Sequence, residues 1–355
     1  MKFGKPVRFL AAVFALGLIT SGCSATKGQS KSIDPPPEEA DVMLQKALDA
    51  LSEEDLVKDG EAGGTNSLQC TVYFKDSNGF VVPVSLPMAD ESKPAQKALE
   101  AMVEDGPAKS MLPKGFTALL PKGTVVNSLN IDKNKLATVD FSSEFTQYNG
   151  QDERKMLEAL TWTLTSFPTV EKVKILVDGQ VLPEMPELGT PLNEPLSRMM
   201  GINIEFAPGV DPGRTTPVVL YFKGSTKENF NYYVPVTRLI SRTEDVAQAT
   251  VEELVKGPDI ASGLMTALTS DIKIIEVSKS ADNSLVSVDF GRAFLDADQK
   301  ASPEAIQEVV LSLIETIHSE KIQLSVNGNT TIQASGNQSI SQPVTKPTHI
   351  NPYKA

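Results

Sequence analysis

Residues 139–142 read Val-Asp-Phe-Ser and are followed by Phe145, while residues 288–291 read Val-Asp-Phe-Gly and are followed by Phe294. The two segments lie 149 residues apart in a chain of 355 residues. A chain of this length accommodates about two domains. The pair of segments therefore predicts two copies of one domain.

Further matches that extend outward from these segments indicate a duplication, because repetition at a fixed period is typical of a repeated structural unit. Four more pairs recur in the same order, at offsets of 148 to 152 residues: Tyr-Phe-Lys at 73–75 and 221–223, Val-Pro-Val at 82–84 and 234–236, Gly-Pro at 106–107 and 257–258, and the closing segments at 173–179 and 322–328.

Each copy is predicted to contain a β-hairpin, a helix, two strands, a second helix and a last strand. The first helix of copy one should begin at Pro94 with Ser92 as its cap and end at Gly106. In copy two, residues 241–244 read Ser-Arg-Thr-Glu and fit a capping box before the first helix. The strand pairs are expected at 124–131 and 136–142, and at 272–278 and 285–290.

The second helix of each copy is indicated by one apolar face, and Ser302 should cap the helix of copy two. The positions at i, i+3, i+4 and i+7 are Leu157, Leu160, Thr161 and Leu164 in copy one, and Ile306, Val309, Val310 and Leu313 in copy two.

We therefore predict an α+β fold with two tandem two-layer sandwich domains. Each would follow the order β-α-β-β-α-β, with its helices on one face of a mainly antiparallel sheet. The predicted organisation is a signal peptide at 1–22, a flexible tether at 23–66, the first domain at 67–198, a linker at 199–214, the second domain at 215–335 and a polar, mobile tail at 336–355.

The N-terminus has the pattern of a secretory leader. Three cations precede an uncharged apolar run from residue 9 to about residue 20, which is shorter than the roughly 20 residues of a membrane-spanning helix. The run ends in Ile-Thr-Ser-Gly-Cys at 19–23, which resembles a bacterial lipobox with threonine where leucine is commonest. We predict cleavage before Cys23 and lipidation of Cys23 by acyl chains such as palmitate. The alternative is an ordinary signal peptide with an incidental cysteine.

The tether carries its own helical pattern at Leu44, Ala47, Leu48 and Leu51. This pattern fits a short amphipathic helix that docks on a partner or on the protein's own domain. It fits equally well a nascent helix in a disordered linker.

Composition restricts the possible chemistry. The formal net charge is −12 and falls to −15 once residues 1–22 are removed, which disfavours nucleic-acid binding. Cys23 and Cys70 are the only cysteines, so lipidation leaves Cys70 without a disulfide partner, and we expect it to be a buried apolar residue. His318 and His349 have no metal-ligand spacing, and neither a metal nor a cofactor is predicted.

Asp140 and Asp289 occupy equivalent positions and are the strongest candidates for chemistry. A catalytic acid or base needs a partner within hydrogen-bond reach, and the repeat places no histidine near either aspartate. We interpret each as an acceptor of backbone N–H groups where a strand leaves the sheet. Residues 289–291 spell the Asp-Phe-Gly kinase motif without the rest of the kinase set, so no catalytic residue is predicted.

Three aromatic residues are candidates for an interface. Trp162 is the only tryptophan and lies one residue from Thr161 on the apolar face of a predicted helix, and Tyr232 and Tyr233 lie in the second hairpin. Exposed aromatic residues beside an apolar face favour contact with a partner. Packing in the core is the alternative for all three.

The ordered set of matches resembles the GerM family of sporulation and germination lipoproteins of spore-forming Firmicutes, whose tandem units are GerMN domains. The resemblance rests on the Tyr-Phe-Lys openings, the Gly-Pro helix ends, the Val-Asp-Phe strands and the closing segments, and covers about residues 67–198 and 215–335. GerMN domains resemble the ring-building modules of secretion and sporulation channels. The resemblance implies a non-catalytic component of the channel complex between mother cell and forespore.

We therefore expect a scaffold that is lipid-anchored on the extracytoplasmic face of the membrane. Expected partners are channel proteins of the sporulation envelope, the membrane itself and further copies of the chain, joined head to tail in contacts that can close into rings. The alternative is a binding lipoprotein that recognises a cell-wall or small-molecule ligand between the two copies. The sequence shows no aromatic cluster at that junction, which disfavours this alternative, and a carboxylate-only hydrolase is a third possibility.

Overall fold

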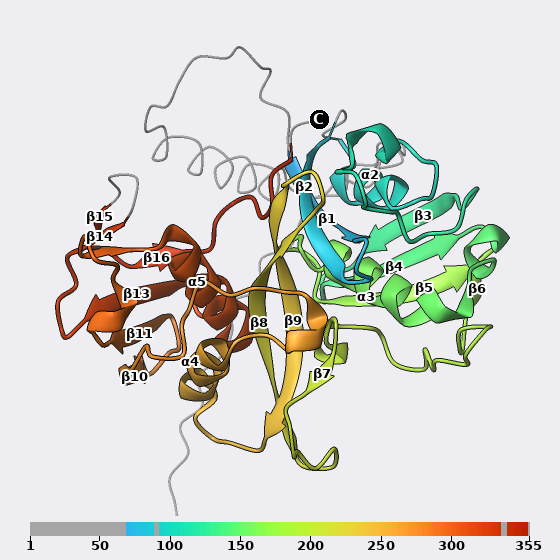
Figure 1. The fold of residues 1–355 in the computed structure, drawn as a ribbon. Helices are drawn as coiled ribbons and strands as arrows, with labels where there is room; N and C mark the ends of the chain where they lie inside the picture. Colours follow the sequence, from blue (N-terminus) through green and yellow to red (C-terminus); the bar gives the residue numbers. More distant parts are fainter. Residues whose placement is uncertain (1–68, 89–91, 335–338, 354–355) are drawn as a thin grey trace, which may run out of the picture. The chain divides into compact units, whose positions relative to one another are not determined.

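The computed structural model describes residues 69–88, 92–334 and 339–353. The predicted leader, Cys23 and the tether with its helical pattern lie outside the described residues. The chain divides into residues 1–64 and residues 65–355, and the second unit holds all the elements described here (Figure 1). Within the described ranges, no helix is long and apolar enough to cross a membrane.

The predicted α+β fold with two repeats is confirmed. The first repeat contains β1 (Gln69–Lys75), β2 (Val81–Pro87), α2 (Pro94–Ala101), β3 (Val126–Ile131), β4 (Leu136–Phe141), α3 (Glu153–Leu164), β5 (Lys172–Val177) and β6 (Gln180–Val181). The second repeat contains β8 (Thr215–Ser225), β9 (Asn231–Ser241), α4 (Val246–Lys256), β10 (Ile274–Lys279), β11 (Leu285–Phe290), α5 (Pro303–Ile317) and β13 (Lys321–Val326).

Short elements complete the two repeats. The short strands are β7 (Glu205–Phe206), β12 (Lys300–Ala301), β14 (Ile332–Ala334), β15 (Ser339–Ile340) and β16 (Val344–Thr345). The short 3₁₀ helices are Lys109–Met111, Ser143–Thr146, Gly150–Asp152, Arg198–Met200, Ile260–Ser262 and Arg292–Phe294.

Each repeat contains a separate hairpin sheet in addition to a second sheet. In the second sheet of repeat one, β3 and β4 are antiparallel and β4 and β5 are parallel, and β10, β11 and β13 repeat this arrangement. We predicted a single, mainly antiparallel sheet in each repeat. The structure separates the hairpin from the second sheet and pairs two strands of the second sheet in parallel. The edge strands β3 and β10 each carry a register shift at equivalent positions, as bulges that protect an exposed edge do.

The repeated Val-Asp-Phe segments form the central strands β4 and β11. The Phe141 and Phe145 rings stack with their centroids 4.5 Å apart, and the equivalent rings in repeat two stack at 4.3 Å. The Oδ1 atom of Asp140 accepts the Gly179 N–H at 2.8 Å, and that of Asp289 accepts the Gly328 N–H at 2.9 Å. The prediction that these aspartates hold backbone N–H groups at strand ends is confirmed.

Three predicted boundaries, on two helices, are wrong. α2 has Lys93 rather than Ser92 as its N-cap, and it ends at Ala101 because the next residues turn to pair with residue 120. α4 is capped by Asp245, whose carboxylate accepts the Gln248 N–H at 3.1 Å. The proposed capping box fails because its first residue, Ser241, is still part of β9.

The predicted cap of α5 and the burial of the lone thiol are confirmed. The Ser302 side chain accepts the Ala305 N–H at the start of α5. Cys70 exposes 5% of its surface, and burial raises the pKa of its thiol to about 11.

The prediction of a mobile tail is wrong for residues 339–353. β16 pairs with β13 and places Val344 opposite Ile322. Farther along, Ile350 and Asn351 are buried, and the Ile350 carbonyl accepts a hydrogen bond from the Ser85 hydroxyl at 2.8 Å. Apolar residues spaced among the polar ones give this segment a buried side, which its overall polarity conceals.

Candidate functional site

Two of the three aromatic residues predicted to form an interface are buried, and the third is half-buried. Trp162 and Tyr232 expose 1% of their surface or less, and Tyr233 is half-buried. The indole N–H of Trp162 donates to the Gly201 carbonyl at 3.3 Å, and the Tyr232 hydroxyl donates to Asp76 of the first repeat at 2.7 Å. Trp162 and Tyr232 are therefore not exposed interface residues, and they stabilise the contact between the two repeats.

This contact, here called the junction, is centred on the facing strands β2 and β9. Each strand carries a Val-Pro-Val segment, with Pro83 in β2 and Pro235 in β9. A proline has no N–H group to donate to a β-ladder and is therefore found mainly on edge strands. β9 pairs with β7 only at Arg238 and Leu239, so the repeated Val-Pro-Val motif marks the open stretches of the two strands that meet at the junction.

Asn203, in the segment predicted to be a linker, bridges these two strands. Its Oδ1 atom accepts the Val81 N–H at 2.8 Å, while its Nδ2 atom donates to the Val81 carbonyl at 2.8 Å and to the Pro235 carbonyl at 2.7 Å. The φ angle of Asn203 is 47°, a left-handed conformation that asparagine adopts more readily than most residues.

Asn351, near the C-terminus, makes the corresponding contacts. Its Oδ1 atom accepts the Tyr233 N–H at 2.8 Å, and its Nδ2 atom donates to the carbonyls of Tyr233 and Pro83, both at 2.8 Å. Its φ angle is 51°. Asn203 and Asn351, which we call the bridging asparagines, thus satisfy backbone groups that neither proline-containing edge could pair directly.

The junction is isologous, because equivalent residues exchange roles across it. Val81 and Tyr233 are equivalent, since they pair with Lys75 and Lys223, the last residues of the Tyr-Phe-Lys segments. Asn203 therefore binds Val81 of its own repeat and Pro235 of the other, while Asn351 binds Tyr233 and Pro83. Reciprocal contacts of this kind define a two-fold relation. Within the chain, the two repeats are accordingly not joined head to tail. The head-to-tail contact between separate copies of the chain stays a prediction.

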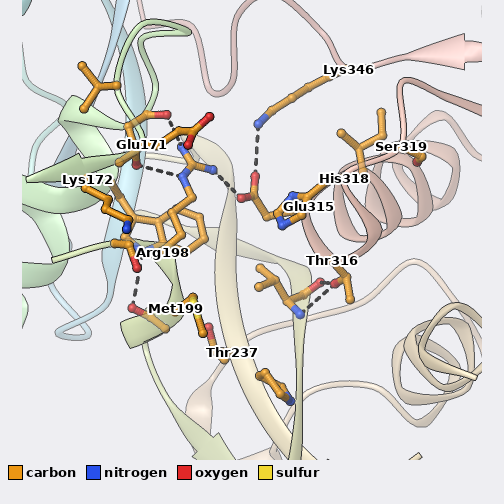
Figure 2. Close-up of a pocket in the computed structure, with 18 residues that line it drawn as sticks. Glu171, Lys172, Arg198, Met199, Thr237, Glu315, Thr316, His318, Ser319 and Lys346 are labelled. Carbon is orange, nitrogen blue, oxygen red and sulfur yellow. Dashed lines mark hydrogen bonds and ion pairs between the residues drawn. The ribbon is translucent and has the colours of Figure 1, made fainter. Parts of the chain in front are cut away.

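An ion cluster around the buried carboxylate of Glu315 lies at the same junction (Figure 2). Arg198 and Lys346, each five residues before a bridging asparagine, both donate to Glu315 of α5. Burial alone would favour the neutral acid, but the two cations outweigh it and lower the pKa of Glu315 to about 2. The Arg198 guanidinium also lies 4.4 Å from the centre of the Trp162 ring, so the cluster and the tryptophan pack as one group.

Aromatic side chains gather at the junction, contrary to the sequence-based prediction. The Tyr73 and Trp162 rings lie 5.8 Å apart, edge to face. At the tip of the second hairpin, Phe230 and Tyr232 contact Phe116 of the first repeat, with ring centroids 6.2 and 5.0 Å away. These residues come from distant parts of the chain, so no local pattern could indicate them.

A cleft of about 640 Å³ opens beside the ion cluster, lined by both repeats (Figure 2). Its walls combine apolar groups such as Trp162 and Val219 with polar ones such as Thr165 and Ser319. The Ser319 hydroxyl is buried without a hydrogen-bond partner in the described part of the chain. Among the described residues, no cluster of three or more histidine, cysteine, aspartate or glutamate side chains could hold a metal ion.

The Germane family, described as sporulation and spore germination, matches residues 71–183 and 219–331. This chain belongs to the Germane family. The spore germination protein GerM of Bacillus subtilis (strain 168) is 34% identical over 357 residues, which cover 96% of each chain.

A solved structure extends the comparison of this Germane protein to the fold. The tandem GerMN domains of the sporulation protein GerM from Bacillus subtilis are 35% identical, cover 81% of this chain and 100% of that chain, and superpose with a TM-score of 0.76. The predicted resemblance to GerM and its tandem domains is confirmed.

The two Germane matches stop before the bridging asparagines, which therefore lie beyond the matched regions. A sequence signal for them was nevertheless present. Ile-Asn at 202–203 recurs at 350–351, and Arg198 and Lys346 show the same offset of 148 residues. The duplication thus extends into the segments that we predicted to be a linker and a tail.

Proposed function

We propose that this chain is a non-catalytic, lipid-anchored assembly component of the channel complex that joins mother cell and forespore during sporulation, with a downstream effect on germination. The observation that carries the proposal is the junction, where buried polar groups bind two copies of one module into a single body. Membership of a sporulation and germination family supports the same cellular process. The proposal includes the channel complex, the lipid anchor at Cys23 and the position of the chain on the extracytoplasmic face of the membrane.

The hydrogen bonds and ion pairs that the polar residues make support a structural role. Asp140 and Asp289 hold turn backbone, and the bridging asparagines hold strand edges. Glu315 is neutralised by two cations from the segments that follow the repeats. A general acid or base must instead be free to reach a substrate proton. These groups are engaged in positioning backbone and joining repeats, which suits a scaffold better than an enzyme.

Crosslinking in sporulating cells tests the assembly role. A photo-crosslinking amino acid is placed at Asn130 on β3 or at Ser278 on β10, exposed positions on the two outer edge strands, with Asp211 in the exposed loop before β8 as the control. We expect proteins of the sporulation envelope to be captured at an edge strand and not at Asp211. A deletion strain in which every envelope complex assembles normally would contradict the proposal.

Fractionation tests the anchor. The Cys23→Ser variant should move from the membrane fraction to the soluble fraction, since two or three acyl chains anchor a protein stably and none remains without the cysteine. The Cys70→Ser variant is the control and should stay with the membrane. Unchanged membrane association of Cys23→Ser would exclude lipidation as the anchor.

A second candidate function, recognition of a cell-wall fragment or a small molecule, is favoured by the cleft. Its volume of about 640 Å³ lies within the range of small-molecule sites, which occur preferentially at domain interfaces. The unpartnered Ser319 hydroxyl supplies an unsatisfied polar group on its wall. A saturable thermal shift with cell-wall fragments, abolished by Ser319→Val, would favour binding, and the absence of a shift would leave the assembly role alone.

A further inference from the structure

One charged residue at the junction has an uncharged equivalent. Glu315 in α5 binds both Arg198 and Lys346, and the position 149 residues earlier is Ser166. The Ser166 hydroxyl instead donates to the Trp162 carbonyl at 2.7 Å. Arg198 and Lys346 would exchange places under a two-fold rotation, but Glu315 has no carboxylate to exchange with. The ion cluster is therefore a point where the two repeats are not equivalent.

This difference decides which repeats can pair. Two first repeats joined in the same way would bring two copies of Arg198 to the junction and no counterpart of Glu315. The Arg198 side chain exposes only 21% of its surface, and a largely buried cation without a counter-charge is strongly unfavourable. A second repeat supplies the missing carboxylate through Glu315.

The second hairpin provides another unequal contact. Its ladder continues for two residue pairs beyond Lys223 and Tyr233, whereas the first hairpin ends at the equivalent pair of Lys75 and Val81. Tyr232 lies in this extension and donates to Asp76 of the first repeat. In the first hairpin the residue that precedes Val81 is Phe80, which has no hydroxyl to donate, so this contact also requires one repeat of each kind.

We propose that the Arg198–Glu315–Lys346 cluster, together with the Tyr232–Asp76 hydrogen bond, makes the junction selective for unlike repeats. The junction surface of the first repeat accepts a second repeat, from its own chain or from a second copy of the chain, and rejects another first repeat. The bridging asparagines supply the contacts that both arrangements share, and the cluster supplies the discrimination.

A chain that can be cut between the repeats tests this selectivity. A protease site replaces residues 208–213, which are mostly exposed and lie between β7 and β8, and the full chain is cut after it has folded. The two halves should remain together as a 1:1 pair in size-exclusion chromatography. After mixing with isotopically labelled cut protein, native mass spectrometry should detect exchanged unlike pairs and no pairs of two first repeats.

Relocation of the carboxylate gives a sharper test. Glu315→Ser should raise the dissociation constant of the halves by about 100-fold, because it leaves two cations without their counter-charge. Addition of Ser166→Glu should recover at least about tenfold of that loss, because Arg198 and Lys346 then exchange roles around a carboxylate at the equivalent position. Glu320→Ser, at an exposed position, should leave the dissociation constant unchanged.

Trp162 gives a separate readout of the junction in the uncut protein. It is the only tryptophan and lies beneath Arg198, so a red shift of its emission reports opening of the junction while far-UV circular dichroism reports the fold. We expect the red shift in Glu315→Ser at unchanged dichroism, and its reversal in the double variant. Wild-type affinity of Glu315→Ser, a folded double variant without recovery, or pairs of first repeats as abundant as unlike pairs would each overturn the proposal.

Discussion

The two repeats share the residues that build a domain and differ in residues that join domains. Both place a strand-end aspartate on a glycine N–H, and in both a helix hydroxyl accepts an N–H from the opening strand: Thr163 from Tyr73 and Ser312 from Tyr221. Only the second repeat carries Glu315 and the longer hairpin. Differences at a few positions therefore make a two-fold contact directional.

The bridging asparagines should show the largest effects. Asn351→Ala should lower the free energy of unfolding by about 2–4 kcal/mol, because it leaves three backbone groups of β2 and β9 without partners and places alanine at a positive φ. Asn203→Ala should lower the free energy of unfolding by about the same amount, since the contacts of Asn203 are equivalent to those of Asn351. Urea denaturation measures both, with the exposed Asn134→Ala as a control that should change little. A loss confined to one asparagine would break the equivalence.

Glu308, a buried acid at a position where the first repeat has alanine, should make the stability depend on pH. Burial raises the pKa of Glu308 to about 7, whereas the equivalent position in α3 is Ala159. Between pH 4.5 and 7 the folded protein holds a proton that the unfolded chain has released, so stability falls as the pH rises through this window. In Glu308→Gln, the free energy of unfolding should fall by about 2–3 kcal/mol less across this window than in the wild type.

Thermal unfolding at pH 5 and pH 8 measures the Glu308 effect. The difference in Tm between the two conditions should shrink in Glu308→Gln, with Glu252→Gln on the exposed side of α4 as the control. An unchanged difference would show that Glu308 does not titrate in this range.

The strand-end aspartates should differ modestly from each other. Asp289 accepts hydrogen bonds from the Gly328 N–H and from the Ser325 hydroxyl, whereas Asp140 accepts the Gly179 N–H and has Leu176 at the position of Ser325. We expect Asp289→Ala to cost about 1–2 kcal/mol and Asp140→Ala about 1 kcal/mol in urea denaturation. Loss of catalysis or binding without loss of stability would point to a chemical role instead.

The smallest effect is expected when a residue of one repeat is replaced by the residue found at the equivalent position of the other repeat. Cys70 is equivalent to Val218, and both are buried. Cys70→Val should therefore change the free energy of unfolding by less than about 1 kcal/mol. The wild-type thiol should also fail to react with thiol reagents at pH 8 until the protein unfolds, and rapid labelling of the folded protein would contradict the burial of Cys70.

The sequence predicted the elements within each repeat better than the contacts between them. Strands and second helices follow from periodic apolar positions and from motifs such as Val-Asp-Phe, which act locally. The junction depends on Asn203 and Asn351, which bind residues more than a hundred positions away. Single polar side chains carry no periodic signal, so the segments that contain them resembled a linker and a tail. The Ser241 capping box failed for a related reason, because the ladder of β9 extends through that residue.

Hydrogen exchange measures whether the two repeats form one body in solution. The backbone N–H groups of Val81 and Tyr233 are donated to the bridging asparagines and to no strand. If the junction persists in solution, both N–H groups should exchange as slowly as those of Val139 and Val288 inside the two sheets, through global unfolding alone. Exchange of Val81 and Tyr233 about 100-fold faster than Val139 and Val288 would show that the repeats separate while each stays folded, and would contradict the account.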